Sequence, residues 1–203
     1  MKNLLKIYFL ILVVVICASC AEKEEADTEN EPTTFVEGTW KKACSQSSSE
    51  RYSEYIMVYK NTSLNYYVNE YSDSACTTAY RTVRYTYTLA VGSEATMADG
   101  STTTTKVTLT SVGVYATAKA DASVSESNNN SFCSATDWAK DVEKDITSKA
   151  TEDTCLQIND AMGTVYKDVY KIKGTDLWWG LETSDKDSEG YYTVIQDSTY
   201  DKQ

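Results

Sequence analysis

Histidine is absent from all 203 residues of this sequence, which removes the side chain most often used for proton transfer near neutral pH. The Ser-x-x-Lys motif and the Gly-x-Ser-x-Gly nucleophile elbow are absent as well, so neither of these serine nucleophile arrangements is present. Carboxylates are abundant, but no two of them are singled out as the acid and base of a glycosidase. We therefore expect a binding protein and not an enzyme, and we expect no cofactor.

Basic residues are also scarce. Lysine and arginine number 19 against 30 aspartates and glutamates, which gives a formal net charge of −11 at pH 7. Such a surface repels the phosphates of nucleic acids and the headgroups of anionic lipids. We expect no nucleic-acid partner, whereas a basic protein partner is compatible with this charge.

The sequence contains no apolar run long enough for a typical spanning helix, which needs roughly 20 residues. The first apolar run covers only residues 7–18, and Lys2 and Lys6 precede it. A basic start followed by a short apolar core is typical of a secretory signal peptide. The sequence therefore predicts export from the cytoplasm.

Small residues at positions 18 and 19 stand directly before Cys20, and this arrangement resembles a bacterial lipobox. The resemblance implies that Cys20 becomes the mature N-terminus and carries thioether-linked and amide-linked acyl chains such as palmitate. Several chains hold a protein on a bilayer, because each buried methylene contributes about 0.8 kcal/mol. Ala21 in place of aspartate implies transfer to the outer membrane of the cell envelope. The alternative is ordinary secretion, with Cys20 incidental or disulfide-bonded.

Proline occurs only once, at position 32, where an acidic segment ends. Residues 22–31 carry six carboxylates and one lysine. Such a segment repels itself and buries little, so it stays extended. We therefore expect a signal peptide at 1–19, a lipidated cysteine with a flexible acidic tether at 20–32, and one folded domain at 33–203.

Four cysteines follow the leader: Cys44, Cys76, Cys133 and Cys155. An even number in an exported chain indicates disulfides, and four cysteines allow three pairings. We favour Cys44 with Cys76 and Cys133 with Cys155, because each pair brackets a contiguous stretch. Zinc is the competing interpretation, but the sequence lacks histidine and a close Cys-x-x-Cys pair.

Polar and apolar residues alternate through most of the domain. This period of two is typical of β-strands with one apolar face. The strand-like segments cover residues 51–60, 63–72, 79–91, 102–120, 164–174, 175–183, 190–197 and a last short run near 198–202. We expect about eight or nine antiparallel strands that form a barrel or a sandwich.

One segment departs from this alternation. Trp138, Val142 and Ile146 recur every four residues, which predicts one short helix near 137–146. The serine- and asparagine-rich segment 123–131 before it is predicted to be a mobile loop.

The start of the domain resembles the first barrel strand of lipocalins and related calycins. Gly38, Thr39 and Trp40 form the Gly-x-Trp pattern of that family. The resemblance implies a single antiparallel up-and-down barrel, with the tryptophan across its closed end and a small ligand inside. The family usually places an arginine near the last strand, and Lys202 is the basic residue found near that place.

Aromatic residues on the barrel strands are the candidates for a ligand-binding interior, because they combine apolar area with a polar tip. Adjacent residues on a strand point to opposite faces, so only one of Trp178 and Trp179 can point inward. The predicted lining comprises Trp40, Tyr66, Tyr85, Tyr87, Tyr170 and Trp178.

An ordered acidic run near the C-terminus resembles the opening of a calcium loop. Asp185, Asp187 and Glu189 alternate and are followed by Gly190, but Gln196 stands where a bidentate glutamate is expected. A calcium site and a hairpin turn with solvated charges are the two interpretations, and the missing glutamate favours the hairpin turn.

Two functions are compatible with these observations. The first is a lipid-anchored envelope protein that binds a small apolar or amphipathic ligand in a lipocalin-like barrel. The second is a surface or periplasmic interaction module, an inhibitor or an adhesin, whose barrel core is solid and whose acidic exterior binds a basic protein.

Overall fold

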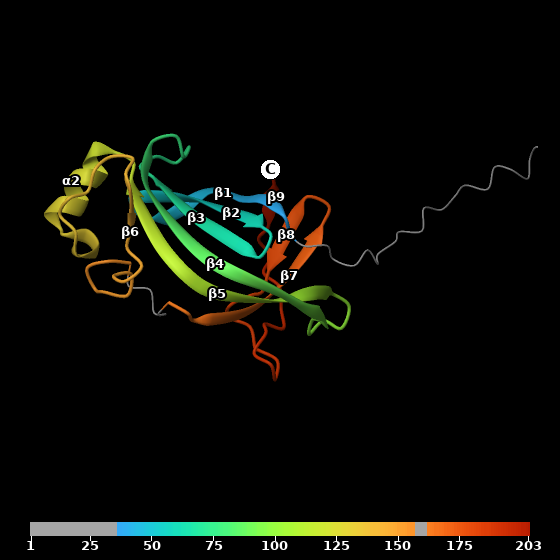
Figure 1. The fold of residues 1–203 in the computed structure, drawn as a ribbon. Helices are drawn as coiled ribbons and strands as arrows, with labels where there is room; N and C mark the ends of the chain where they lie inside the picture. Colours follow the sequence, from blue (N-terminus) through green and yellow to red (C-terminus); the bar gives the residue numbers. More distant parts are fainter. Residues whose placement is uncertain (1–35, 157–161) are drawn as a thin grey trace, which may run out of the picture. The chain divides into compact units, whose positions relative to one another are not determined.

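The computed structural model describes residues 36–156 and 162–203. The predicted signal peptide, Cys20 and the tether lie outside the described residues. In the described part of the chain, no helix has both the length and the apolar character needed to cross a bilayer. Strands dominate this part and form one nine-stranded sheet (Figure 1).

Eight of the nine strands close into a barrel. Each pairs with its neighbours in antiparallel fashion, and β9 pairs with β1 to close the ring, while β6 pairs only with β5. The strands are β1 (Gly38–Ser48), β2 (Arg51–Lys60), β3 (Ser63–Tyr71), β4 (Ala79–Thr96), β5 (Thr103–Ala118), β6 (Glu143–Asp145), β7 (Val165–Lys173), β8 (Asp176–Trp179) and β9 (Tyr200–Lys202). The predicted antiparallel up-and-down barrel is therefore confirmed.

Polar and apolar side chains alternate along the strands, and the apolar ones form the interior of the barrel. Met57 on β2 lies opposite Tyr66 on β3, and Tyr66 lies opposite Tyr85 on β4. The rings of Tyr66 and Tyr85 are 6.0 Å apart between centroids. Directly opposite residues share one face of a sheet, so these side chains form a row across three strands.

Trp40 anchors the core at one end of the barrel. It is only 1% exposed, and its Nε1 donates a hydrogen bond of 3.2 Å to the carbonyl oxygen of Val36. Lys202 places its Nζ 5.5 Å from the centre of the Trp40 ring, in cation–π contact. Gly38 has a φ of +131°, a conformation that other residues rarely adopt, where the chain enters β1. The basic residue expected near the last strand thus contacts the tryptophan.

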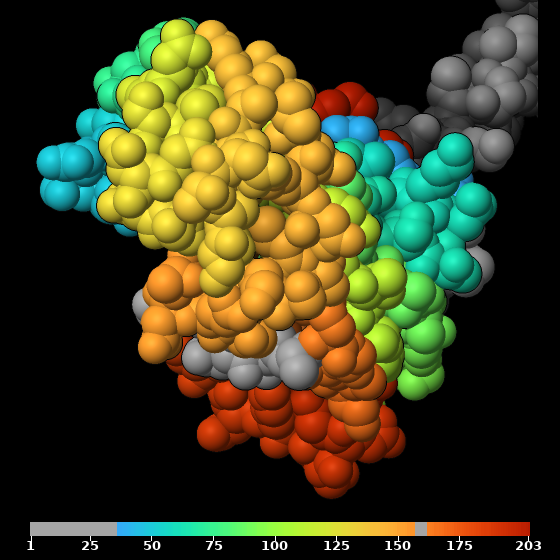
Figure 2. All heavy atoms as spheres, turned by 60° about the vertical axis from the view of Figure 1, so that its left-hand side comes forward, coloured from blue at the N-terminus to red at the C-terminus, as the bar shows by residue number. Residues whose placement is uncertain are grey.

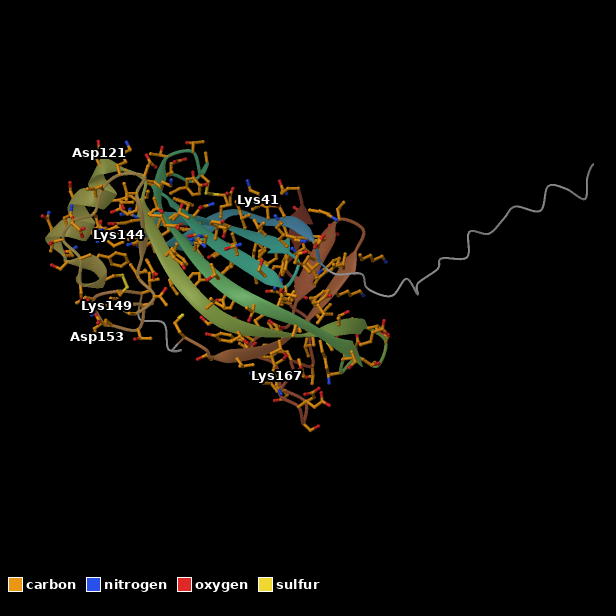
Figure 3. The ribbon with its side chains drawn as sticks, in the orientation of Figure 1. Lys41, Asp121, Lys144, Lys149, Asp153 and Lys167 are labelled. Atoms are coloured by element: carbon orange, nitrogen blue, oxygen red, sulfur yellow. A yellow bond between two sulfur atoms is a disulfide. The ribbon has the colours of Figure 1, made fainter. Side chains whose placement is uncertain are left out.

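A second core cluster lies at the other end, beneath the segment that connects β5 to β7. This segment contains α2 (Asp121–Asn129), a 3-10 helix η1 (Phe132–Ser134) and β6, which gather at one end of the barrel in Figures 1 and 2. Trp138, Cys133 and Ile146 are buried here with residues of β4 and β5. Figure 3 shows four charged side chains of this end: Asp121, Lys144, Lys149 and Asp153.

The position predicted for the helix is wrong. Residues 137–146 contain β6 instead, and Val142 is 51% exposed while Trp138 and Ile146 are buried, so these residues do not share one apolar face. The helix α2 occupies the segment that we predicted to be a loop. Its residue Asn128 exchanges hydrogen bonds with the backbone of Trp138, at 2.7 and 3.0 Å. Long-range polar contacts, and not an apolar periodicity, hold this helix in place.

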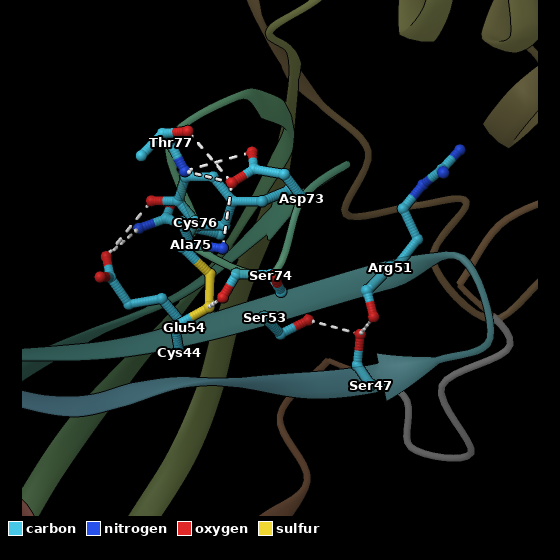
Figure 4. Close-up of a disulfide and its surroundings, with 12 residues drawn as sticks. Cys44, Ser47, Arg51, Ser53, Glu54, Asp73, Ser74, Ala75, Cys76 and Thr77 are labelled. Atoms are coloured by element: carbon cyan, nitrogen blue, oxygen red, sulfur yellow. Dashed lines mark hydrogen bonds between the residues drawn. A yellow bond between two sulfur atoms is a disulfide. The ribbon is translucent and has the colours of Figure 1, made fainter.

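Both predicted disulfides are present. Cys44 on β1 is bonded to Cys76 in the loop after β3 (Figure 4), with 6.1 Å between their Cα atoms. Asp73 organises this loop, because its carboxylate accepts hydrogen bonds from the backbone N–H groups of Ala75, Thr77 and Thr78. The bonds from Thr78 and Thr77 lower the pKa of Asp73 to about 2. The second disulfide, Cys133–Cys155, lies within the segment that covers the second core cluster.

Candidate ligand-binding site

A pocket of about 400 Å³ lies inside the barrel. Aromatic and aliphatic side chains make up much of its wall, and they come from six strands. They are Met57, Leu64, Tyr66, Tyr87, Leu109, Trp179 and Tyr200. Asp168 and Glu182 add two carboxylates to this wall. Pockets that bind small molecules typically combine such an apolar lining with a few polar groups.

A second pocket of about 690 Å³ adjoins the first. The two share Tyr87, Leu109, Asp168 and Glu182 as lining residues. The loop between β8 and β9 supplies Lys186 and Tyr192 to the second pocket. We refer to the 400 Å³ space as the inner pocket and to the 690 Å³ space as the outer pocket.

Asp168 owes its inward position to the register of β7. It lies opposite Val107 of β5, which is fully buried, and it shares its face of β7 with Tyr170. Its Oδ1 accepts a hydrogen bond of 2.7 Å from the N–H of Val169 and one of 3.0 Å from the N–H of Gly180. Its carboxylate therefore ties β7 to the end of β8.

Gly180 is required for this contact. A Cβ atom at this position would overlap the Asp168 carboxylate and would lie 2.7 Å from Cδ2 of Tyr192. No larger residue fits without displacing one of these two side chains.

Burial raises the pKa of Asp168 from 3.8 to about 7. The hydrogen bonds from Val169 and Gly180 and the charge of Lys186 act in the opposite direction, while the charge of Glu182 raises the pKa further. Burial outweighs the hydrogen bonds because removing a carboxylate from water disfavours its charged form. Burial likewise raises the pKa of Tyr200, to about 12.

The predicted lining residues occupy four kinds of position. Tyr66 and Tyr87 are in the wall of the inner pocket. Trp40 and Tyr170 are fully buried in the core, and Tyr85 packs against the second core cluster. The placement of Trp178 is wrong, because the pairing of β8 with β7 sets Trp179 opposite the inward-facing Tyr170 and turns Trp178 to the other face.

Several pocket residues were missed by the sequence analysis. The signal for Asp168 was present, because it is two residues from Tyr170 and must share its face in a regular strand. The inward direction of Met57 and Leu109 could likewise have been predicted from the alternation of side chains along β2 and β5. Glu182 and Gln196 lie in the loop between β8 and β9. The strands predicted at 175–183 and 190–197 are wrong over most of this stretch, because β8 ends at Trp179 and β9 begins at Tyr200.

The calcium-like run forms a turn held by a lysine. Lys106 Nζ lies 3.0 Å from a carboxylate oxygen of Asp187 and 2.7 Å from one of Glu189. The other oxygen of Asp187 accepts hydrogen bonds from the N–H groups of Glu189 and Tyr191. Asp185 contributes its backbone carbonyl oxygen to Thr193 instead. Over residues 36–156 and 162–203, no three carboxylates, histidines or cysteines are grouped so as to hold a metal ion.

A scan against protein-family models and a search of curated proteins both found no match for this chain. The closed antiparallel barrel agrees with the fold that the pattern at Gly38 to Trp40 implies. Evidence for function therefore comes from the pockets and from the charged groups that line them.

Proposed function

We propose that this protein is a lipid-anchored protein of the cell envelope that binds a small apolar or amphipathic molecule inside its barrel. The inner pocket of about 400 Å³ carries this proposal. Its volume lies within the range of about 300–1,000 Å³ that is typical of small-molecule sites. A solid core would have favoured the alternative of a protein-interaction module, so this space favours the ligand-binding function.

Binding, and not catalysis, accounts best for the lining. Apolar side chains dominate the wall of the inner pocket. An aromatic wall supplies a large contact area at a low cost in side-chain entropy.

The two disulfides support export to an oxidising compartment, since such bonds rarely persist in the cytosol. Membrane attachment through Cys20 then places the barrel at the outer membrane. Metabolic labelling with a palmitate analogue tests this part, because wild-type protein is expected to be labelled and a Cys20→Ala variant is not.

Ligand binding is tested by filling the inner pocket. We expect wild-type protein to bind N-phenyl-1-naphthylamine with a rise in the fluorescence of the probe, and we expect Leu109→Trp to abolish this rise. Val112→Trp is the matched control, because Val112 is 53% exposed and lies on the same strand. Native mass spectrometry of protein purified from its own membrane is expected to show a bound small molecule. The proposal is contradicted if Leu109→Trp and Val112→Trp give the same rise in probe fluorescence, or if native mass spectrometry shows only the mass of the protein without a bound molecule.

A further inference from the structure

The inner pocket has an unbalanced charge. Its ionisable lining residues other than tyrosine are Asp168 and Glu182, and neither lysine nor arginine lines it. Asp168 lies inside the barrel, whereas Glu182 is exposed where the loop after β8 begins. One carboxylate therefore lies deeper in the pocket and the other lies closer to solvent.

No basic side chain in the described part of the chain neutralises these two carboxylates by an ion pair. The nearby lysines have other contacts. Lys167 donates to the carbonyl oxygen of Glu189 at 2.7 Å, and Lys186 lies 4.6 Å from the centre of the Tyr192 ring. Lys186 lowers the pKa of Asp168, but burial dominates and keeps this pKa raised. Among the described residues, Asp168 is therefore influenced by Lys186 but forms no close ion pair with it.

Aromatic side chains share the pocket wall with these acids. Tyr66, Trp179 and Tyr200 line the same pocket, and such rings attract cations to their faces. Trp179 is only 6% exposed, and its Nε1 has no hydrogen-bond partner. This N–H can donate only to an acceptor, so the part of Trp179 that a cation can contact is the face of its ring.

We infer that the inner pocket binds an amphipathic organic cation, with its ammonium group between Asp168 and Glu182 and its apolar part against Met57, Leu64 and Trp179. This inference rests on the proposed ligand-binding function and specifies the class of ligand. Carboxylates and aromatic faces together are the groups that recognise ammonium ions. A fatty acid would bring a third negative charge beside two carboxylates, so the same geometry disfavours anionic amphiphiles.

Three probes with the same tail test this inference: octylamine, octanol and octanoate, measured by isothermal titration calorimetry with the wild-type protein at pH 8. We expect octylamine to bind about tenfold more tightly than octanol, since one favourable charge contact of about 1.4 kcal/mol gives a factor of ten. Octanoate is expected to bind more weakly than octanol.

Variants then assign the preference to the carboxylates. Asp168→Asn is expected to bring octylamine within about threefold of octanol while octanol binding is unchanged, because the apolar wall remains. Asp185→Asn is the matched control and is expected to keep the preference for octylamine. Glu182→Gln provides a second, exposed position at which a smaller loss is expected, which keeps the test valid if Asp168→Asn alters the fold.

The outcomes separate the two proposals. If all three probes bind equally, or if Asp168→Asn and Glu182→Gln both keep the preference for octylamine, the inference is overturned and the ligand-binding function stands. If none of the probes binds and no ligand accompanies the protein from its membrane, both proposals are overturned.

Discussion

Asp168→Asn is expected to stabilise the folded protein at pH 8. Burial raises the pKa of Asp168 from 3.8 to about 7, so between these values the folded protein keeps a proton that the unfolded chain has released. When the folded state binds more protons, the free energy of unfolding falls as pH rises. Stability is therefore lost progressively as the pH rises from about 4 to about 7, and the loss is complete above the raised pKa.

The magnitude follows from the size of the shift. One pKa unit corresponds to about 1.4 kcal/mol, so a shift of roughly three units sets an upper bound of about 4 kcal/mol at pH 8. Asparagine keeps a carbonyl oxygen for the N–H groups of Val169 and Gly180 and carries no charge. Hydrogen bonds to a neutral acceptor are weaker than those to a carboxylate, which offsets part of the gain. We expect a net gain of about 1–3 kcal/mol at pH 8 and little difference near pH 4.

Urea unfolding followed by tryptophan fluorescence, repeated at several values between pH 4.5 and 8, measures this difference. Asp185→Asn is the control, because Asp185 is exposed and is expected to leave the pH dependence unchanged. Parallel pH curves for wild type and Asp168→Asn, or a less stable Asn variant at pH 8, would refute the reasoning.

Three further predictions concern other parts of the chain. Gly180→Ala is expected to lower stability by about 2 kcal/mol or more, measured by urea unfolding, because the new methyl group overlaps neighbours; wild-type stability would contradict this. Cys133→Ser combined with Cys155→Ser is expected to cost about 3 kcal/mol, measured in the same way against wild-type protein with both disulfides intact; an unchanged free energy of unfolding would contradict this. Cys20→Ala is expected to move the protein from the detergent phase to the aqueous phase in Triton X-114 partitioning; unchanged partitioning would exclude the lipid anchor.

The barrel was predictable because its information is local. Alternation at Tyr55, Met57 and Tyr59 defines one face of β2 without reference to any other strand. The disulfides were predictable for a related reason, since each closes a loop between cysteines that are consecutive in the sequence.

The direction of each face was not predictable from one strand alone. Trp178 and Trp179 are equivalent until β8 pairs with β7, and only the pairing of Trp179 with Tyr170 decides which of them points inward. The helix was missed for a similar reason. Asn128 of α2 is hydrogen-bonded to the backbone of Trp138, which follows the helix, and Glu126 of α2 accepts a hydrogen bond from Tyr80 of β4. Neither contact can be recognised from the sequence of the helix alone.

Asp168 shows why the site was harder to predict than the fold. An isolated aspartate on a strand usually faces solvent, and its chemical type argues against a core position. Its inward direction follows only from its spacing to Tyr170. Groups that serve a function are often kept at the expense of stability, so the stability that this carboxylate costs above pH 7 fits the binding role proposed for it.

The ring of strands is closed by very little backbone. On the β1 side, β9 contributes two residue pairs, Trp40 with Lys202 and Lys41 with Asp201, and on the β8 side it contributes two more. A strand without a neighbour exposes a row of N–H and C=O groups to which another chain can pair. The three residues of β9 therefore cover part of the edges of β1 and of the four-residue β8 at once. A chain shortened before Tyr200 is expected to self-associate through β1 and β8, and it also loses the Tyr200 side chain from its core.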